Sequence, residues 1–380
     1  MEVPRTLLVT NDYPPRVGGI QRTLHALWRT LPPDRLAVLA PAWEGADAFD
    51  AGEPYRIDRF ESDFAWPTPE TRRRVRRAID EFAAGVVLFG AAYPLATLGP
   101  GVAKRGVPYL AAAHGFEYWL SLAPGAHAAM RYATSRAARV AVMCSAFIAR
   151  VVRTAVPGSV PVSVMYPGAD VEAFSPDLDV TEIRARHDLL DRPVVVCVSR
   201  LVPRKGQDVL IRAMPEVVRR VPDAALLIVG DGPYRRTLEQ MAFEAPPRSV
   251  VMAGQVGEDE LPRYYAAGDV FAMPCRTRKG GLEVEGWGNV FIEAAACARP
   301  VVVGDSGGAR ESVVDGGTGV LVEGANVGEV ADAVSSLLED PVRAAAMGRA
   351  GRERVERSFT WPLAADQLAG WLREAATTGS

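Results

Sequence analysis

Short apolar runs alternate with amphipathic segments along the whole chain. In the first half we predict buried strands at residues 6–10, 35–40, 86–90, 109–113 and 140–144. In the second half we predict them at residues 193–199, 225–230, 249–254, 270–274, 300–305 and 319–323. Apolar runs this short are typical of parallel strands that are covered on both faces. Helical patterns separate the strands, for example over residues 207–220, 234–243 and 259–267.

This alternation predicts an α/β protein with right-handed crossovers between parallel strands. Two sets of strands predict two doubly wound, Rossmann-like domains that face each other across a cleft. We place the boundary in the Pro- and Gly-rich stretch 165–177, which gives domains at 1–168 and 169–360. We expect a last helix, 361–376, to pack back on the first domain. Open parallel sheets bind ligands beyond the carboxyl ends of their strands, so the site is expected in the cleft.

Composition narrows the class of protein. The 380 residues are 48% hydrophobic and 23% charged, with a net charge of −3, which gives no reason to expect a nucleic-acid partner. The four cysteines are far apart and form no C-x-x-C pair, so we expect buried free thiols and no zinc site. The start has no basic leader, and no apolar run reaches the ~20 residues of a membrane span. We therefore expect a cytoplasmic protein that could still lie on a membrane surface.

Two stretches have the composition of a phosphate site. Gly18 and Gly19 follow the first strand and precede a helix, whose free N–H groups suit an anion. Alone, such a pair is more often a flexible turn. Arg200 follows a strand of the second domain, and Lys205 stands just before the next helix. These two cations suit a diphosphate, although a solvated turn would look the same.

The stretch "EVEGWGNVFIEA" (283–294) places Glu285 at a glycine-flanked turn and Glu293 on the following helix. Carboxylates accept hydrogen bonds from paired hydroxyls, so sugar diols are natural partners. The alternative for Glu293 is an acid that the helix dipole stabilises.

Together these motifs resemble the retaining glycosyltransferases of the GT-B fold that carry an E-x(7)-E motif. The resemblance is greatest to the GDP-mannose-dependent phosphatidylinositol-mannoside mannosyltransferases of actinobacteria, and it runs through nearly the whole chain. It rests on "LLVTNDYPPRVGGIQ", "VSRLVPRKGQDVLI", "DVFAMPCRTRKGGLEVEG" and "GDSGGARESV". Phe116, Trp287 and Asn289 depart from the pattern of this subfamily.

The resemblance implies a role for each matching residue. Gly18, Gly19, Arg200 and Lys205 would hold the donor diphosphate, and Arg200 and Lys205 would also stabilise the departing nucleotide. Glu285 would bind the transferred sugar with support from the backbone of Gly286, Trp287, Gly288, Asn289 and Val290, and Glu293 would bind the ribose. Gly254, Gln255 and Val256 would edge the slot for the base. His114 would lie near the reacting sugar, and Asp12 would contact the acceptor.

The resemblance therefore predicts transfer of a hexose from a nucleotide sugar, namely α-mannose from GDP-mannose, without a cofactor or metal. The acceptor would be a phosphatidylinositol-mannoside-like glycolipid or another hydroxyl compound. A soluble natural-product or cyclitol acceptor with a UDP-sugar donor remains an alternative within the class. From other classes, a non-catalytic sugar-nucleotide-binding protein remains possible, whereas a nicotinamide dehydrogenase is disfavoured because "GDGPYR" (230–235) lacks the last glycine of the dinucleotide fingerprint.

A basic segment bears on the acceptor. In "ETRRRVRRAIDEF" (70–82), Val75, Ala78, Ile79 and Phe82 share one helical face, which should pack on the first domain. The five arginines 72, 73, 74, 76 and 77 would then be exposed. Such a helix could simply be solvated, or it could rest on the anionic inner face of the cell membrane.

Overall fold

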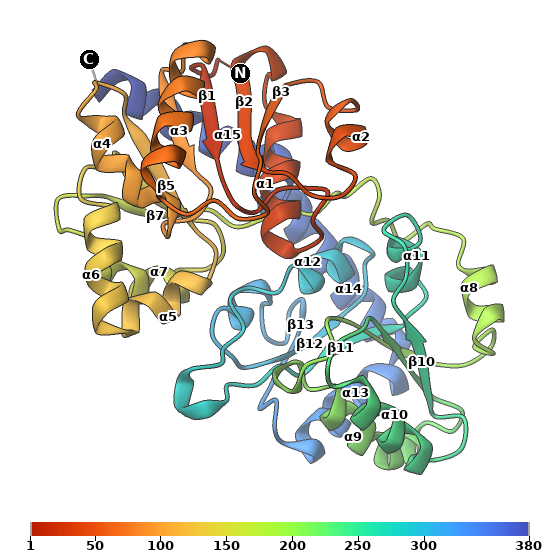
Figure 1. The fold of residues 1–380 in the computed structure, drawn as a ribbon. Helices are drawn as coiled ribbons and strands as arrows, with labels where there is room; N and C mark the ends of the chain where they lie inside the picture. Colours follow the sequence, from red (N-terminus) through yellow and green to blue (C-terminus); the bar gives the residue numbers. More distant parts are fainter. Residues whose placement is uncertain (1, 379–380) are drawn as a thin grey trace. The chain divides into compact units, whose positions relative to one another are not determined.

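The computed structural model describes residues 2–378 and divides them into two compact units. The first consists of the residues up to Pro167 together with those from Trp361 onward, and the second runs from Gly168 to Thr360. The boundary predicted after residue 168 thus lies one residue from this division. Figure 1 shows the ribbon of both units, with labels on most of their helices and strands.

The first unit contains a parallel sheet with the strand order β3-β2-β1-β4-β5-β6-β7. Its strands are β1 (Thr6–Val9), β2 (Leu36–Pro41), β3 (Arg56–Phe60), β4 (Val86–Phe89), β5 (Tyr109–Ala113), β6 (Arg139–Val142) and β7 (Val162–Val164). Its helices are α1 (Gly19–Thr30), α2 (Ala46–Asp50), α3 (Pro69–Phe82), α4 (Gly99–Ala103), α5 (Phe116–Leu122), α6 (Pro124–Ala133) and α7 (Ala146–Val152).

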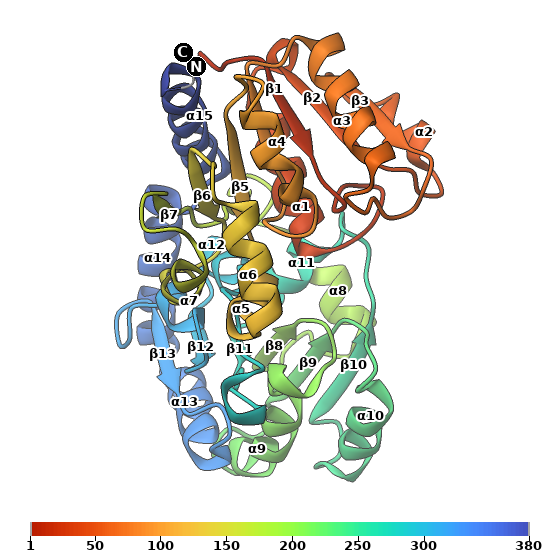
Figure 2. The same ribbon diagram turned by 60° about the vertical axis from the view of Figure 1, so that its left-hand side comes forward.

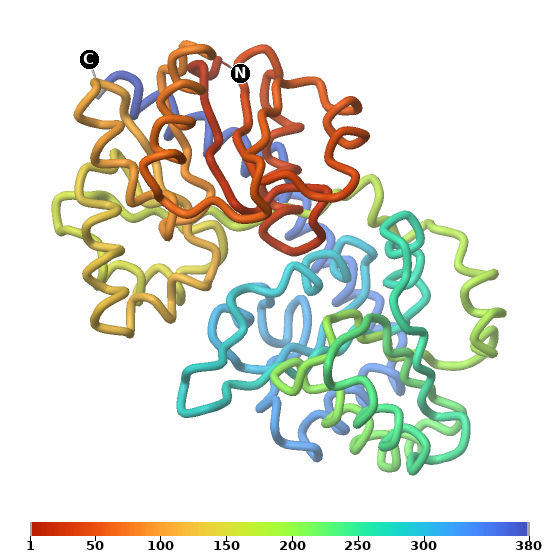
Figure 3. Tube along the Cα trace, in the orientation of Figure 1, coloured from red at the N-terminus to blue at the C-terminus, as the bar shows by residue number. Residues whose placement is uncertain are grey.

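The last helix, α15 (Trp361–Thr378), belongs to this first unit. Its residues Leu368 and Leu372 are fully buried in the same apolar cluster as Leu24 and Trp28 of α1. In the tube drawing the helix is the dark blue segment among the red and orange N-terminal segments (Figure 3). The end of the chain therefore completes the core of the domain in which the chain begins.

The second unit contains another parallel sheet, with the order β10-β9-β8-β11-β12-β13 (Figure 2). Its strands are β8 (Val194–Val198), β9 (Ala225–Val229), β10 (Val250–Gly254), β11 (Val270–Met273), β12 (Val301–Gly304) and β13 (Gly319–Val322). Its helices are α8 (Thr181–Arg186), α9 (Gln207–Arg220), α10 (Arg235–Glu244), α11 (Leu261–Ala266), α12 (Asn289–Ala296), α13 (Val327–Glu339) and α14 (Pro341–Ser358).

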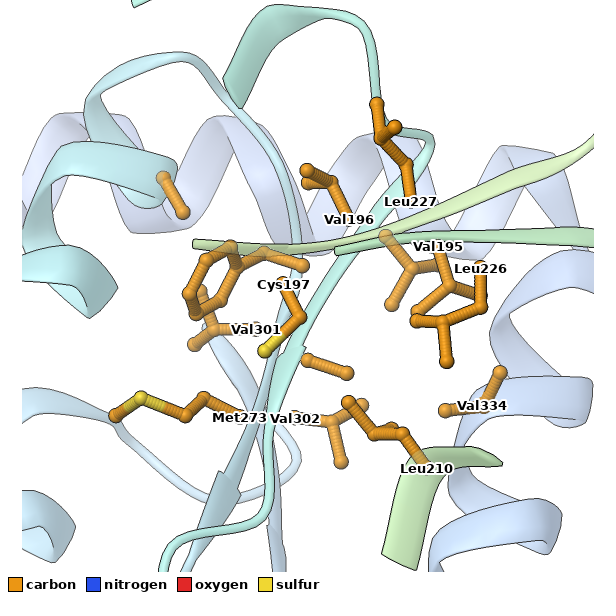
Figure 4. Packing of buried hydrophobic residues seen from close by; sticks show 14 of the residues in the cluster. Val195, Val196, Cys197, Leu210, Leu226, Leu227, Met273, Val301, Val302 and Val334 are labelled. Carbon is orange, nitrogen blue, oxygen red and sulfur yellow. The ribbon is translucent and has the colours of Figure 1, made fainter. Parts of the chain in front are cut away.

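The core of the second unit explains why its strands are uniformly apolar. Every residue of β8 and β9 is buried, and paired residues such as Val195 and Leu226 lie side by side in register. Figure 4 shows Val195 on the side of the sheet where Leu210 of α9 and Val334 of α13 lie. Helices on the faces of a parallel sheet bury both sides of each strand. The predicted parallel α/β class is confirmed for both units.

Two strands were missed by the sequence pattern, and both lie at the edges of the first sheet. β3 reads "RIDRF" and β7 reads "VSV", and their side chains are largely half-exposed. An edge strand needs no continuous apolar run, because one of its sides has no neighbouring strand. The four cysteines are free and buried, as predicted. No helix among residues 2–378 combines the length and the apolar character needed to cross a bilayer.

Candidate active site

A buried carboxylate with two cations lies at the carboxyl edge of the second sheet. Glu285, in the loop after β11, is 6% exposed, and Lys205, in the loop after β8, is 9% exposed. Lys205 Nζ lies 2.7 Å from Glu285 Oε2. Arg204 Nη1 donates a hydrogen bond to the same oxygen. The structure therefore brings Lys205 and Glu285 into direct contact.

Backbone packing brings these two loops together. Gly206, directly after Lys205, has a φ of 80°, and a Cβ at this position would lie 2.1 Å from the carbonyl oxygen of Pro274. Only glycine allows the loop after β8 to press this closely on the end of β11. Glu285 is fixed in turn by the loop after β12, because its N–H donates to Ser306 Oγ at 3.2 Å and its carbonyl accepts from Gly308 N at 2.8 Å.

The two cations also decide the charge of Glu285. Burial by itself would raise the pKa of this carboxyl, but the charges of Lys205 and Arg204 outweigh that effect and lower the pKa below its usual value. Glu285 is therefore ionised at neutral pH. Its second oxygen, Oε1, accepts no hydrogen bond from any residue between 2 and 378. That oxygen is free to accept a hydrogen bond from a ligand hydroxyl.

Two arginines, Arg200 and Arg204, lie in the loop after β8, and they differ in their contacts. Arg200 is exposed at the end of β8, and within residues 2–378 its guanidinium has neither a hydrogen bond nor an ion pair. Arg204 contacts Glu285, although the sequence reading passed over it. The signal was present, since Arg204 is adjacent to Lys205 in "PRKG". Arg204 and Lys205 lie in one 3₁₀ turn, and the sequence does not indicate which of the two side chains faces Glu285.

Glu293 occupies the second turn of α12 and is 5% exposed. The hydroxyl of Tyr265 donates to Glu293 Oε2 at 2.6 Å, which orients the carboxylate. Because Glu293 is buried and bonded to a side chain of α11, it is not simply a solvated acid stabilised by the helix dipole. The sequence analysis did not predict this role of Tyr265, because the apolar pattern of α11 assigns Tyr265 to the core.

The backbone from Gly286 to Val290 forms the turn into α12. Gly288 has a φ of 84° and precedes the helix, where a Cβ would lie 2.6 Å from the ring of Phe291. Asn289 and Val290, which begin the helix, are half-exposed. Trp287 is buried, and its ring lies 5.3 Å from that of Phe359. The departure from the subfamily at Trp287 is thus accommodated by packing inside the second unit.

The predicted base slot lies at the edge of the sheet. Gly254 ends the edge strand β10 with a φ of 76°, and its carbonyl accepts a hydrogen bond from Gly230 N at 2.7 Å. Gln255 is exposed and Val256 is half-buried. These residues are at the same carboxyl edge as Lys205 and Glu285, with β9 between β10 and β8.

In the first unit, the side chain of Gln21 in α1 contacts Asp12 and lies beside Gly18. Gln21 Nε2 donates to Asp12 Oδ1 at 2.8 Å, and a Cβ on Gly18 would lie 2.3 Å from Gln21 Oε1. Gly19, the first residue of α1, has open space around it. Burial raises the pKa of Asp12, and the Arg16 charge partly offsets that effect. The predicted phosphate-binding and acceptor-binding residues of this domain are therefore neighbours.

His114 follows β5 and is held in one orientation. Its Nε2 lies 2.8 Å from the carbonyl oxygen of Gly90, so this nitrogen carries the proton and donates it. Its backbone N–H donates to Glu117 Oε2 at 2.9 Å. Burial lowers the pKa of His114 to about 4, although the hydrogen bond to Gly90 opposes the shift. A neutral imidazole with Nε2 engaged leaves Nδ1 as an acceptor.

Two family models match the chain. "Glycosyl transferases group 1" covers residues 179–354, and "Glycosyltransferase Family 4" covers residues 17–173. A GDP-mannose-dependent alpha-(1-6)-phosphatidylinositol monomannoside mannosyltransferase of Mycolicibacterium smegmatis is 47% identical over 96% of this chain and 97% of its own length. A Corynebacterium glutamicum enzyme, named for the monoacylated form of that acceptor, is 40% identical over 97% of this chain and 98% of its own.

The chain is a GT-B glycosyltransferase. The solved structures agree on the fold of this glycosyltransferase, since Anabaena HepE in complex with UDP and glucose matches with a TM-score of 0.81. That match covers 97% of this chain and 99% of HepE at 20% identity. A sucrose-phosphate synthase from Thermosynechococcus elongatus matches with a TM-score of 0.79 at 21% identity, over 98% of this chain and 100% of its own. The expected enzyme class and fold are confirmed.

The ion pairs of Glu285 with Lys205 and Arg204 lead to a prediction about the stability of this glycosyltransferase. Glu285→Gln would leave two cations, one of them buried, without their carboxylate, and should lower the free energy of unfolding by about 3 kcal/mol. Glu283→Gln is the matched control, because Glu283 pairs with Arg278 and Lys279 on the same loop but is more exposed. Its loss should stay below about 1 kcal/mol. Urea unfolding followed by circular dichroism measures both, and equal losses would contradict the assignment.

The environment of His114 predicts its titration. The folded-state pKa of about 4 lies below the ~6.5 of an unfolded histidine, so protonation favours the unfolded chain. Stability should therefore fall as the pH drops from about 6.5 towards 4, and His114 should remain neutral from pH 8 to pH 5. Ring resonances of ¹⁵N-labelled histidine, assigned by their loss in His114→Gln, measure this. A titration midpoint near 6.5 would contradict the neutral, half-buried imidazole.

Proposed function

We propose that this glycosyltransferase transfers mannose from GDP-mannose to a hydroxyl of a phosphatidylinositol-mannoside acceptor, with retention at the anomeric carbon. The observation that carries the proposal is the 40–47% identity, over nearly the full length, to enzymes that are named for this donor and acceptor. The ionised Glu285 with its free oxygen supports it, because a sugar hydroxyl is a natural partner for such an acceptor.

The donor is assigned to residues of the second unit. Lys205 has three donors and uses one on Glu285, which leaves N–H groups for the diphosphate. The unpaired guanidinium of Arg200 can contact the same phosphates with its planar fork. Glu293, oriented by Tyr265, would accept hydrogen bonds from the ribose diol. Gly254, Gln255 and Val256 would edge the base.

In the proposed reaction the acceptor oxygen forms a bond to the anomeric carbon while the bond to the diphosphate breaks. The acceptor proton passes to the departing phosphate oxygen. Catalysis would come from positioning and from fixed positive charge near the leaving group. We propose that Arg200 and Lys205 make a divalent metal unnecessary, since they supply the charge that a metal would otherwise contribute.

The acceptor is assigned to the first unit. Asp12, held by Gln21, and the neutral His114 would contact the acceptor and the reacting sugar. Gly18 and Gly19 would offer backbone N–H groups at the start of α1. Directly after His114, the helix α5 exposes Phe116, Trp119 and Leu122 at a spacing of three residues. These apolar side chains are consistent with an acceptor that carries lipid.

The direct test is a transfer assay with purified enzyme, in the presence of EDTA. GDP-mannose with phosphatidylinositol monomannoside should give product, and UDP-glucose should not. In the same assay Arg200→Ala should lower turnover by about 10²-fold, as expected for the loss of one charge-stabilising donor. Arg200 is a sharper probe than Lys205, because its removal leaves no buried partner unpaired. Arg200→Lys should restore only part of the rate.

The control is Arg236→Ala, an exposed arginine of the second unit that has no partner within residues 2–378. Near-normal turnover of a folded Arg200→Ala variant would refute the phosphate assignment. Loss of activity in EDTA that magnesium restores would refute the metal-free proposal. Transfer to a soluble cyclitol with none to the glycolipid would favour the alternative acceptor class. Binding of GDP-mannose without transfer or hydrolysis would favour a binding protein.

We also propose that the enzyme rests on the anionic inner face of the cell membrane through α3. The predicted apolar face is buried, since Val75, Ala78, Ile79 and Phe82 all lie in the core. Arg77 Nε bonds to Glu81 at 2.6 Å, so it contributes less than predicted. Arg72, Arg73 and Arg76 are exposed as predicted, whereas Arg74 is half-buried. None of these four has an acidic partner within residues 2–378. Each is worth roughly 1 kcal/mol at an anionic surface.

The membrane proposal predicts binding to vesicles that contain phosphatidylinositol at low salt. Changing Arg72, Arg73 and Arg76 to glutamate should abolish sedimentation with the vesicles, and higher salt should weaken it in the wild type because the Debye length shortens. The control carries the same charge change on exposed arginines of the second unit, at Arg236, Arg343 and Arg357. If the wild type stays in the supernatant at low salt, or if both triple variants lose binding equally, the role of α3 is wrong.

A further inference from the structure

A pocket lies in the second unit, at the opposite edge of its sheet from the candidate active site. Pro193, Asp269 and Pro300 line it, and each immediately precedes a strand, respectively β8, β11 and β12. Leu337 of α13 and Ala344 of α14 also line it. Parallel strands place all their amino ends at one edge, whereas Lys205 and Glu285 follow carboxyl ends. The pocket has a volume of about 660 Å³.

The lining of this pocket is unusually rich in arginine. It contains four arginines and two aspartates, which gives a net charge of +2: Arg184, Arg192, Arg299, Arg349, Asp191 and Asp269. Two of the arginines are fully engaged. Arg184 donates to Asp269 Oδ1 at 3.0 Å and to Ala267 O, and Arg192 donates to three backbone carbonyls.

The other two arginines lack anionic partners. Arg299 Nε is fully buried and has no acceptor, and neither Arg299 nor Arg349 forms an ion pair within residues 2–378. Asp269 cannot serve both arginines well, since Arg184 occupies Oδ1 and the N–H of Val194 donates to Oδ2 at 2.7 Å. A buried donor without a partner costs roughly 1–3 kcal/mol, and more when it is charged. Arg299 therefore brings to the pocket wall a guanidinium whose charge is not neutralised by an ion pair within residues 2–378.

The remaining walls are apolar. Pro176, Leu190, Leu338 and Ala345 line the pocket between the charged groups. Ligand sites typically combine such walls with a few well-placed polar groups. Burial lowers the pKa of the Arg299 guanidinium, and the attraction of Asp269 only partly offsets this effect, which agrees with a cation that lacks a direct counter-charge.

We propose that this pocket binds a small organic phosphate, whose dianionic group contacts Arg299 and Arg349 and whose apolar part packs on Leu190 and Leu337. Two uncompensated guanidiniums match a phosphate dianion in charge, and the planar fork of each guanidinium suits phosphate oxygens. This site is separate from the donor site and does not depend on the proposed function. It gives the enzyme a place where a metabolite other than its substrates can bind.

Isothermal titration calorimetry with phenyl phosphate tests the proposal. The donor site could also take this probe, so the titration is repeated on Arg200→Ala, which should bind as tightly as the wild type. Arg299→Met and Arg349→Met should each weaken binding at least 10-fold. Arg236→Met, an exposed arginine outside the pocket, is the matched control and should bind normally. Phenol, which has the ring without the charge, should not bind.

Three results would overturn the proposal. The first is no measurable binding of phenyl phosphate up to about 10⁻² M, the weak end of the range for a small ligand. The second is an unchanged affinity for phenyl phosphate in both Arg299→Met and Arg349→Met. The third is an affinity for phenol equal to that for phenyl phosphate. A loss of binding in Arg200→Ala with none in the pocket variants would place the probe in the donor site. If Arg299→Met fails to fold, Arg349→Met decides the question, because Arg349 is exposed and its replacement leaves no partner behind.

Discussion

The candidate active site of the second unit depends on one buried carboxylate, Glu285. A carboxylate this far from water is stable in its ionised form only beside positive charge, and Lys205 and Arg204 supply it. The same contact fixes two loops that are some 80 residues apart in the chain. Gly206 and Ser306 then tie these loops to β11 and to the loop after β12. One ion cluster therefore orders the strand ends from which the catalytic groups project.

The sequence predicted this cluster only in part, and the reason is geometric. Glu285 and Lys205 follow buried strands, and parallel strands bring their carboxyl ends to one edge, so their meeting could be inferred. Which of Arg200 and Arg204 turns inward depends on the short turn between them, which no apolar periodicity describes. The role of Tyr265 was not predicted either, because its contact with Glu293 leaves no mark in the sequence pattern. A buried aromatic on a helix is normally core, and only its hydroxyl contact with Glu293 gives it a second role.

The fold, like the ion cluster, could be predicted from the sequence in part. Helix α9 has the predicted limits 207–220, because its apolar positions face the sheet at helical spacing and Gly206 precedes it. All strands of the second sheet and the central strands of the first were evident, whereas the edge strands β3 and β7 were not, since their short runs include polar residues. In the first unit the ends of β1, β4 and β5 meet at Thr10, Gly90 and His114. A Cβ on Gly90 would lie 2.5 Å from Thr10 Oγ1, a close approach that no pattern of apolar positions encodes.

Helix α12 relates the two edges of the second sheet. It begins at Asn289 beside the donor residues, carries Glu293 in its second turn, and ends at Ala296, three residues before Arg299. At the first edge every buried charge has a partner within the protein. At the second edge Arg299 forms no ion pair with any residue from 2 to 378, although its neighbours Arg184 and Arg192 are fully bonded. In a parallel sheet the helix between two strands carries the chain from the carboxyl edge back to the amino edge, and α12 does so between β11 and β12. The eight residues of α12 thus separate the donor residues at one edge from the loop that carries Arg299 at the other.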